Sequence, residues 1–218
     1  MCGRFASFKN HEKLKNIFDL KNKSEKIHPS FNVSPGQNIN IIFHYDFHNY
    51  LLESNWGYSF INNDTQRKQI VINSRMETIT TKLLFKDSFL KRKCIIPING
   101  YYEWGVKSGE KKPYYIQLGD GELIYLAGIW RKENHNEKKI KVFSILTKAA
   151  NFTIQKVHHR MPVIFNANEA VQYLENQNNN TFINNLTKTD EIDLKFYEVS
   201  KHVNNPKNDD AKCIEEIN

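Results

Sequence analysis

Short apolar runs rich in β-branched and aromatic residues follow one another along most of the chain. The runs that predict strands are 39–45, 50–52, 69–73, 94–98, 101–104, 114–118, 123–129 and 140–147. Helical spacing of apolar residues is found at 9–20, 78–91 and 168–175. Because helices and strands do not alternate and no long repeat occurs, we expect an α+β fold. It would be a single domain, residues 1–218, built on a curved, mainly antiparallel and barrel-like sheet flanked by a few helices.

Composition excludes several other classes of protein. Aromatic residues make up 12% of the chain, too many for a disordered protein. No apolar stretch is long enough for a membrane span, and the N-terminal segment is charged where a secretion signal would be apolar. Cys94, Cys213 and His202 lack the spacing of metal ligands, and no C-x-x-C pair occurs. We therefore expect a cytoplasmic protein with no membrane association, disulfide framework, metal or other cofactor.

The charge of the chain is compatible with a nucleic-acid partner but does not require one. Lys and Arg number 31 and Asp and Glu 24, which gives a net charge of +7. Only six of the basic residues are arginines, and Arg4, Arg75 and Arg160 fall inside the segments considered next. These arginines are therefore more informative than the many lysines.

The N-terminus combines two nucleophiles on one residue. Initiator Met1 is normally removed when the next side chain is small, which would leave Cys2 with a free α-amine and a thiol. The pKa of an α-amine is about 8 and that of a thiol is about 8.5, so a fraction of each group would be nucleophilic at neutral pH without an elaborate activating site. An aldehyde could then form a Schiff base with the amine and close a thiazolidine ring with the sulfur. The alternative is that Cys2 is only a small buried apolar residue.

Asn73 and Arg75 stand two residues apart at the end of an apolar run. In a strand, residues at this spacing share a face, so both side chains could point into one cleft. A turn is the alternative interpretation, with Thr78 as the N-cap of the following helix.

Two further segments contain residues suited to proton transfer. Glu103 lies among aromatic residues, and a carboxyl group in such surroundings can act as a general acid and base, although it could also be an ordinary exposed strand residue. Trp104 and Trp56 could stack on unpaired bases or belong to the core. His158 could move a proton at neutral pH and Arg160 could hold a phosphate, while a structural role for this histidine is the alternative.

In their order along the chain, these segments resemble the SRAP family of SOS response-associated peptidases, or abasic-site processing proteins. The segments that carry the resemblance are 1–5, 32–37, 56–57, 72–78, 94–104, 112–114, 127–130, 158–162, 199–200 and 203–204. Two positions depart from the family pattern. His159 stands where the family usually has aspartate, and Ser74 stands where it usually has alanine.

The resemblance implies an SRAP-type fold and a set of catalytic roles. Cys2 would crosslink to the ring-opened aldehyde of an abasic site in single-stranded DNA, after autocatalytic loss of Met1. Asn73 would orient Cys2 and the sugar, Glu103 would relay protons, and His158 would assist opening of the sugar ring. The family also implies strand scission or crosslink reversal in some members.

The resemblance further implies a DNA-binding surface. Arg4, Arg75 and Arg160 would grip the phosphates that flank the lesion. Trp56 and Trp104 are candidates for an aromatic wedge that excludes an opposing strand. Single-stranded DNA with abasic sites would be the partner, and we expect the protein to act as a monomer.

Two other functions are compatible with the same residues. One is an N-terminal-nucleophile amidohydrolase, since one class of glutamine amidotransferases also begins Met-Cys-Gly, with the thiol attacking an amide and the amine serving as base. The other is a module that binds single strands without covalent chemistry, in which Cys2 would be inert and binding would collapse in high salt.

Overall fold

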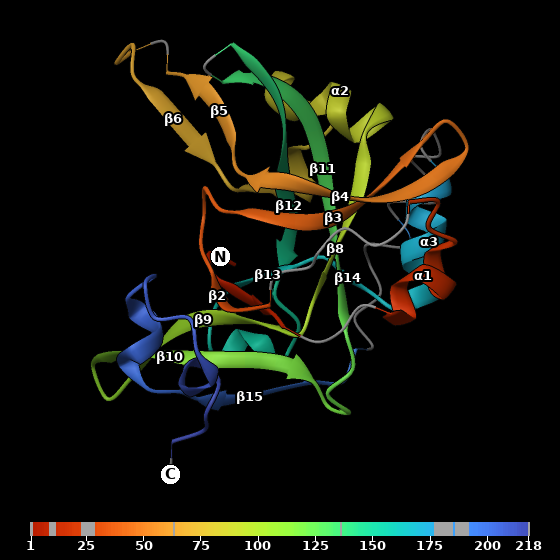
Figure 1. Ribbon diagram of the computed structural model, residues 1–218. Coiled ribbons are helices and arrows are strands. Elements are labelled where there is room, and N and C mark those ends of the chain that lie inside the picture. The colour runs from red at the N-terminus through yellow and green to blue at the C-terminus, as the bar shows by residue number, and fades with distance from the viewer. Residues whose placement is uncertain are drawn as a thin grey trace.

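The computed structural model describes residues 2–8, 12–22, 29–62, 64–135, 137–176, 185 and 192–217. Over these residues the chain is mainly β, with three short α-helices and several 3₁₀ turns. The helices are α1 (Glu12–Phe18), α2 (Leu83–Lys91) and α3 (Ala167–Glu175). The α+β class with a mainly antiparallel sheet is therefore confirmed (Figure 1).

Five strands close into a barrel. They are β3 (Asn38–Tyr45), β4 (His48–Trp56), β8 (Lys93–Ile98), β11 (Ile124–His135) and β12 (Lys138–Ala149). Antiparallel pairing joins β4 to β3, β3 to β8, β8 to β11 and β11 to β12. A parallel pairing of β12 with β4 completes the circle. No strand of this ring is left with an unpaired edge along its whole length.

The alternation of side chains divides the apolar residues between the two faces of the barrel. Phe43, Cys94, Ile96 and Phe143 belong to one buried cluster, which fills the interior. The residues that alternate with them along the same strands point the other way and form a second cluster with residues of the helices. This second cluster therefore lies outside the barrel. The helices α2 and α3 pack against β8 and β11 and cover that outer face (Figure 1).

A second, five-stranded sheet extends the interior cluster. Its order is β15-β10-β9-β1-β2, with all pairings antiparallel. The strands are β1 (Phe5–Ser7), β2 (Ser30–Val33), β9 (Gly100–Lys107), β10 (Glu110–Leu118) and β15 (Leu194–Glu198). Phe5 and Tyr101, which face each other across β1 and β9, pack into the same cluster as the barrel interior. The first residues of the chain are thereby fixed between distant strands.

Short elements connect and decorate the two sheets. The strands are β5 (Tyr58–Ile61), β6 (Lys68–Val71), β7 (Asn73–Arg75), β13 (Arg160–Pro162) and β14 (Ile164–Phe165). The 3₁₀ helices are η1 (Met76–Thr78), η2 (Ile154–Lys156), η3 (Lys201–Asn204) and η4 (Ala211–Cys213). The β5–β6 hairpin leaves the barrel at Gly57, whose φ of +135° is unfavourable for residues with a side chain.

Several sequence predictions differ from the structure in their limits. The strand predicted at 69–73 is two strands, β6 and β7. The helix predicted at 78–91 begins at Leu83 and has Lys82 as its N-cap, so Thr78 as the N-cap is wrong. The β-branched residues 78–81 disfavour an earlier start. Residues 9–11 of the predicted first helix lie outside the described residues. No helix among the described residues is long and apolar enough to cross a membrane.

Candidate active site

Cys2 lies in the interior cluster, three residues before β1, with none of its surface exposed. The backbone N–H of Tyr102 donates to the Arg4 carbonyl at 2.9 Å, which fixes this segment against β9. The Asn73 side chain donates from Nδ2 to the Cys2 carbonyl at 2.9 Å. Asn73 Oδ1 is also buried and accepts no hydrogen bond from a described residue. Asn73 therefore holds Cys2 from one side.

Glu103 and His158 approach the same place from other elements. Glu103 lies on β9 and is 3% exposed, and its charge raises the pKa of Cys2 after the larger effect of burial. Burial lowers the pKa of His158, and Glu103 opposes that shift. These mutual effects place Cys2, Glu103 and His158 within electrostatic reach of one another. The four residues predicted to be catalytic are thus brought together from separate segments.

The burial of Cys2 corrects one expectation about its chemistry. The sequence suggested a thiol partly ionised at neutral pH without special activation. Burial and the neighbouring carboxylate raise its pKa well above the ordinary value, so the sulfur is present as a thiol. Its reaction then needs a base in place, and Glu103 is the nearby group that can serve.

The backbone of Arg160 provides partners for both protonation states of His158. The Arg160 N–H lies 3.0 Å from His158 Nδ1, and the Arg160 carbonyl lies 3.2 Å from the same atom. When the ring is neutral, Nδ1 accepts from the N–H, and the proton is on Nε2. When the ring is charged, Nδ1 can donate to the carbonyl. His158 can therefore gain or lose a proton without losing its anchor.

The predicted phosphate-binding arginines differ in availability. Arg75 is exposed at the end of β7, although Asn73 on the same strand is buried. Arg4 donates from Nη1 to Asn32 Oδ1 at 2.8 Å and to the Val203 carbonyl at 2.9 Å. The Arg4 side chain is thus occupied in joining the two ends of the chain.

Arg160 is also engaged within the protein. Its guanidinium forms a two-point ion pair with Glu77, with 3.0 Å between Nη2 and Oε2, and Nη2 also donates to the Thr147 carbonyl at 2.8 Å. Hydrogen bonds from Arg160 lower the pKa of Glu77, which keeps this carboxylate ionised. Sequence reasoning assigned no role to Glu77 or Thr147, although Glu77 lies in the matching segment 72–78. A phosphate would have to share Arg160 with them.

The two candidate tryptophans occupy different environments. Trp56 has no exposed surface and packs against Phe5, with the ring centroids 4.8 Å apart and the rings tilted by 44°. Its Nε1 donates to the Ile72 carbonyl. Trp56 as a DNA wedge is therefore wrong for this structure, because it is a core residue that supports the strand bearing Asn73. Trp104 is half-buried and donates from Nε1 to Asn204 Oδ1 at 2.8 Å.

Ser74 and His159, the two residues that differ from the family pattern, each contact a neighbouring side chain. The Ser74 and Ser144 hydroxyls are 2.7 Å apart in the core, so the additional oxygen of Ser74 is satisfied. His159 is exposed and stacks on His158 with ring centroids 4.3 Å apart. Its charge lowers the pKa of His158, an effect smaller than burial.

A separate group of possible metal ligands lies on the C-terminal segment. His202, Asp210 and Cys213 place ligand atoms within 4.8 Å of one another, which their spacing in the sequence did not indicate. His202 Nε2 lies 3.0 Å from Asp210 Oδ2, and Cys213 Sγ donates to the Asn208 carbonyl at 3.4 Å. Hydrogen bonds within the protein therefore already satisfy the cluster.

Comparisons with known proteins match the chain over nearly its full length. Residues 1–206 match the family described as SOS response associated peptidase (SRAP). The abasic site processing protein YoqW of Bacillus subtilis is 32% identical over 224 residues, with 99% of each chain covered. The abasic site processing protein YedK of Escherichia coli is 26% identical over 226 residues, with 100% of each chain covered.

The fold has a close counterpart among solved structures. A crystal structure of a protein from Bacteroides thetaiotaomicron superimposes with a TM-score of 0.83 at 21% identity, covering 99% of this chain and 100% of that one. The match over nearly the full length, the shared fold and the order of the segments that resemble the family agree. The chain belongs to the SRAP family.

Proposed function

We propose that this protein links Cys2 covalently to abasic sites in single-stranded DNA as a thiazolidine, after autocatalytic removal of Met1. The observation that carries the proposal is the convergence of the buried Cys2, Asn73 and Glu103 with the half-buried His158. The names of its relatives support the abasic site as the substrate. The protein would act in the cytoplasm as a monomer.

The first step is formation of an imine. The charged His158 ring donates its Nε2 proton to the ring oxygen of the abasic sugar as the bond from that oxygen to C1 breaks, and the C1 hydroxyl loses its proton to solvent, which leaves the aldehyde. The Cys2 amine attacks the aldehyde carbon, and Glu103 takes a proton from the attacking nitrogen. Glu103 passes that proton to the carbonyl oxygen and then moves the second nitrogen proton to the resulting hydroxyl, which leaves as water and gives the imine. Asn73 holds the Cys2 carbonyl so that the amine faces the sugar.

The second step is closure of the ring. The Cys2 sulfur adds to the imine carbon, its proton is taken by Glu103, and the imine nitrogen gains a proton. The product contains one new C–N bond and one new C–S bond, and the only loss is one water molecule. Since the imine also acidifies the adjacent carbon of the sugar, strand scission and crosslink reversal would pass through the same intermediate.

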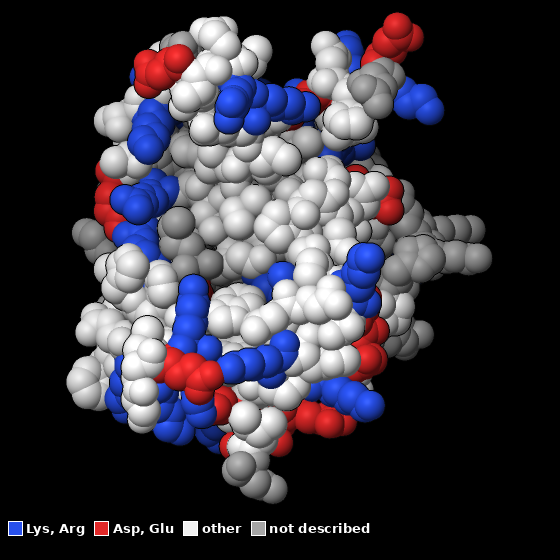
Figure 2. All heavy atoms as spheres, turned by 90° about the vertical axis from the view of Figure 1, so that its left-hand side faces the viewer, with Lys and Arg blue, Asp and Glu red and all other residues white. Residues whose placement is uncertain are grey.

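The surroundings of the site support a single strand as the partner. Figure 2 shows Lys and Arg side chains around a hollow with a mainly uncharged lining, on the left-hand face of Figure 1. Arg75 is the candidate arginine that is exposed for a phosphate. Arg4 and Arg160 are bound within the protein, so they would support DNA binding by holding the residues around them in position. The half-buried Trp104 could present one edge of its ring to a base.

Incubation with an oligonucleotide that carries one abasic site tests the proposal. We expect a product that survives a denaturing gel and whose intact mass equals protein without Met1 plus DNA minus water. Cys2→Ala keeps the amine but lacks sulfur, so its adduct should appear only after borohydride reduction. Glu103→Ala should slow adduct formation by about 100-fold or more. Cys213→Ser, the matched buried cysteine, should behave as the wild type.

Three results would contradict the proposal. An unreduced Cys2→Ala adduct as stable as that of the wild type would exclude the thiazolidine. Equal binding of intact and abasic strands without an adduct would favour the non-covalent module. Hydrolysis of glutamine in the absence of DNA would favour the amidohydrolase.

A further inference from the structure

Phe152 is an exposed aromatic residue on the loop that leads to His158. Its surface is 80% exposed, and Lys156 Nζ lies 5.2 Å from the centroid of its ring. An aromatic face beside a cation is the combination by which proteins bind unpaired nucleobases, because the ring stacks on the base while the cation attracts the adjacent phosphate.

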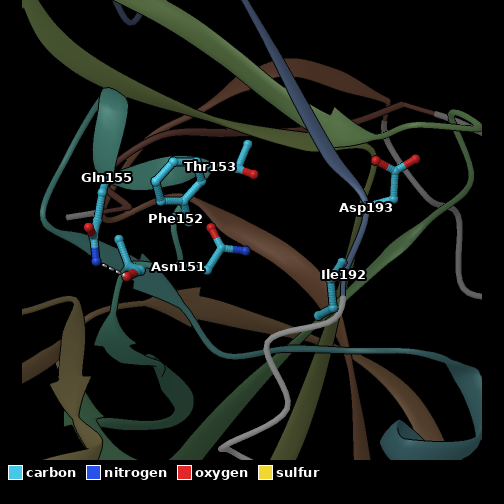
Figure 3. A pocket seen from close by; sticks show the side chains of 7 residues that line it. Asn151, Phe152, Thr153, Gln155, Ile192 and Asp193 are labelled. Carbon is cyan, nitrogen blue, oxygen red and sulfur yellow. Dashed lines mark hydrogen bonds between the residues drawn. The ribbon is translucent and has the colours of Figure 1, made fainter.

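Phe152 also lines a cavity of about 630 Å³ (Figure 3). Its other lining residues are Ala150, Asn151, Thr153, Gln155, Ile192 and Asp193. In Figure 3 the Phe152 ring stands on one side, and Ile192 and Asp193 stand on the other. The Asp193 carboxylate would repel a phosphate, but it can accept a hydrogen bond from the amino group of a base. The lining therefore favours a base over the DNA backbone.

The loop is fixed in place by hydrogen bonds of its own. The Asn151 side chain accepts from the Ile154 N–H at 3.0 Å, and Gln155 Nε2 donates to the Ala150 carbonyl at 2.8 Å. A preformed pocket of this kind loses little conformational entropy when a ligand enters.

The same loop is continuous with the candidate active site. The Ala150 N–H donates to the His159 carbonyl at 3.0 Å, and the His158 N–H donates to the Ile154 carbonyl at 2.9 Å. Ala150 and Ile154 pack in the apolar cluster that contains Cys2. A nucleotide beside the reacting sugar could therefore be held by this loop.

We propose that Phe152 and Lys156 form a subsite for an unpaired nucleobase that flanks the abasic sugar. The base stacks on Phe152 within the cavity, and Lys156 pairs with the phosphate next to it. The inference rests on the proposed function for the identity of the strand, and it adds a base-binding subsite to the abasic-site chemistry.

Non-covalent binding tests the subsite, in a Cys2→Ser background and with a tetrahydrofuran analogue of the abasic sugar, which cannot open to an aldehyde and therefore forms no imine with the N-terminal amine. Binding of a labelled abasic oligonucleotide is measured by fluorescence anisotropy. Phe152→Ala should weaken binding by about 5- to 100-fold, the range for loss of one base stack. Phe152→Trp should retain the affinity, and its fluorescence should be quenched by the DNA. The matched control is Phe47→Ala, since Phe47 is 91% exposed on the turn between β3 and β4 and should be neutral.

A second oligonucleotide isolates the role of the base. When base-free spacers replace the nucleotides next to the lesion, Phe152→Ala and its parent should bind alike. Equal binding of Phe152→Ala and its parent to the normal strand, or an equal loss with Phe47→Ala, would overturn the subsite. In the wild-type background, Phe152→Ala should reach full adduct yield at saturating DNA. The adduct should be lost only in the Cys2 variants. Normal binding by Phe152→Ala together with a wild-type adduct would therefore contradict the subsite alone, whereas absence of the wild-type adduct would contradict the proposed function.

Discussion

At the scale of single residues, His158 is subject to opposing influences. Burial lowers its pKa, Glu103 raises it, and the stacked ring of His159 lowers it. The net shift is downward, which favours the neutral ring with its proton on Nε2. In this chain the residue after His158 therefore contributes to the pKa of its ring. An aspartate there, as the family pattern has, would act with the opposite sign.

The substitution His159→Asp tests this tuning. Replacing the His159 imidazole by a carboxylate should raise the pKa of His158, because the charged His158 ring gains an attractive partner. A higher pKa keeps the ring protonated to higher pH, so the pH above which adduct formation declines should move upward. NMR titration of the His158 ring and the pH profile of the adduct rate measure both effects. His159→Asn should give a smaller rise, and an unchanged or lowered pKa in His159→Asp would refute the tuning.

At the scale of elements, Lys93 lies buried at the start of β8 between two helices. Its Nζ is 5.5 Å from the centroid of the Phe89 ring on α2 and 5.9 Å from that of Tyr173 on α3. It also donates to the Asn176 carbonyl, just beyond α3, at 3.4 Å. Burial lowers the pKa of Lys93 to about 8. The ammonium therefore joins the two helices at some cost in stability.

Substitution of Lys93 by methionine should remove that cost. At pH 7 both folded and unfolded lysine are charged, and Lys93→Met should raise the free energy of unfolding by about 1 to 3 kcal/mol. Between about pH 8 and the ordinary value of 10.5, the unfolded chain binds more protons than the folded one, so the wild type gains stability as pH rises. Urea denaturation at pH 7 and 10.5 should show the advantage shrinking.

The control for this substitution is Lys86→Met on the exposed side of α2, where little change is expected at either pH. An advantage of Lys93→Met that is equal at both pH values would contradict an origin in the buried charge. So would a loss of stability at pH 7.

The sequence predicted elements best where the local pattern carries the information. The long apolar runs became β3, β8, β10, β11 and β12. The short strands β1, β2 and β15 were missed, because their stability comes from pairing with distant strands, as Phe5 pairs with Tyr101. The motifs led to Cys2, Asn73, Glu103 and His158, which the fold brings together. Their setting could not be predicted, since the ion pair of Arg160 with Glu77 and the burial of Trp56 depend on tertiary contacts.

At the scale of the whole molecule, Asn32 links the N-terminal strands to the C-terminal segment. It is fully buried and donates from Nδ2 to the carbonyls of Val203, Asn205 and Asn208, while Oδ1 accepts from Arg4. Through Asn32 the C-terminal segment is thus held against Arg4, which stands only two residues after Cys2. The position of Cys2 depends in this way on residues far along the sequence.

Asn32→Ala should therefore destabilise the protein and release its C-terminal segment. Loss of the amide leaves buried carbonyls and the Arg4 guanidinium with fewer partners, which should lower the free energy of unfolding by about 2 to 3 kcal/mol. Limited proteolysis should cut first within residues 201–213. Asn38→Ala is the matched control on an exposed position and should change stability by less than about 0.5 kcal/mol. Equal effects of the two substitutions would show that Asn32 does not link the two ends.

The internal place of β1 within its sheet sets the order in which the surroundings of Cys2 form during synthesis. β1 lies between β2 and β9, yet it leaves the ribosome before either of them. The partners that enclose Cys2 arrive later, Asn73 first, then Glu103, and His158 last. During synthesis the N-terminus is accessible to the aminopeptidases that act on nascent proteins. After the chain has left the ribosome and folded, the N-terminus is surrounded by groups of the protein itself. Cys2 is thus among the first residues to be translated, and its surroundings are complete only after the chain has been synthesised through His158.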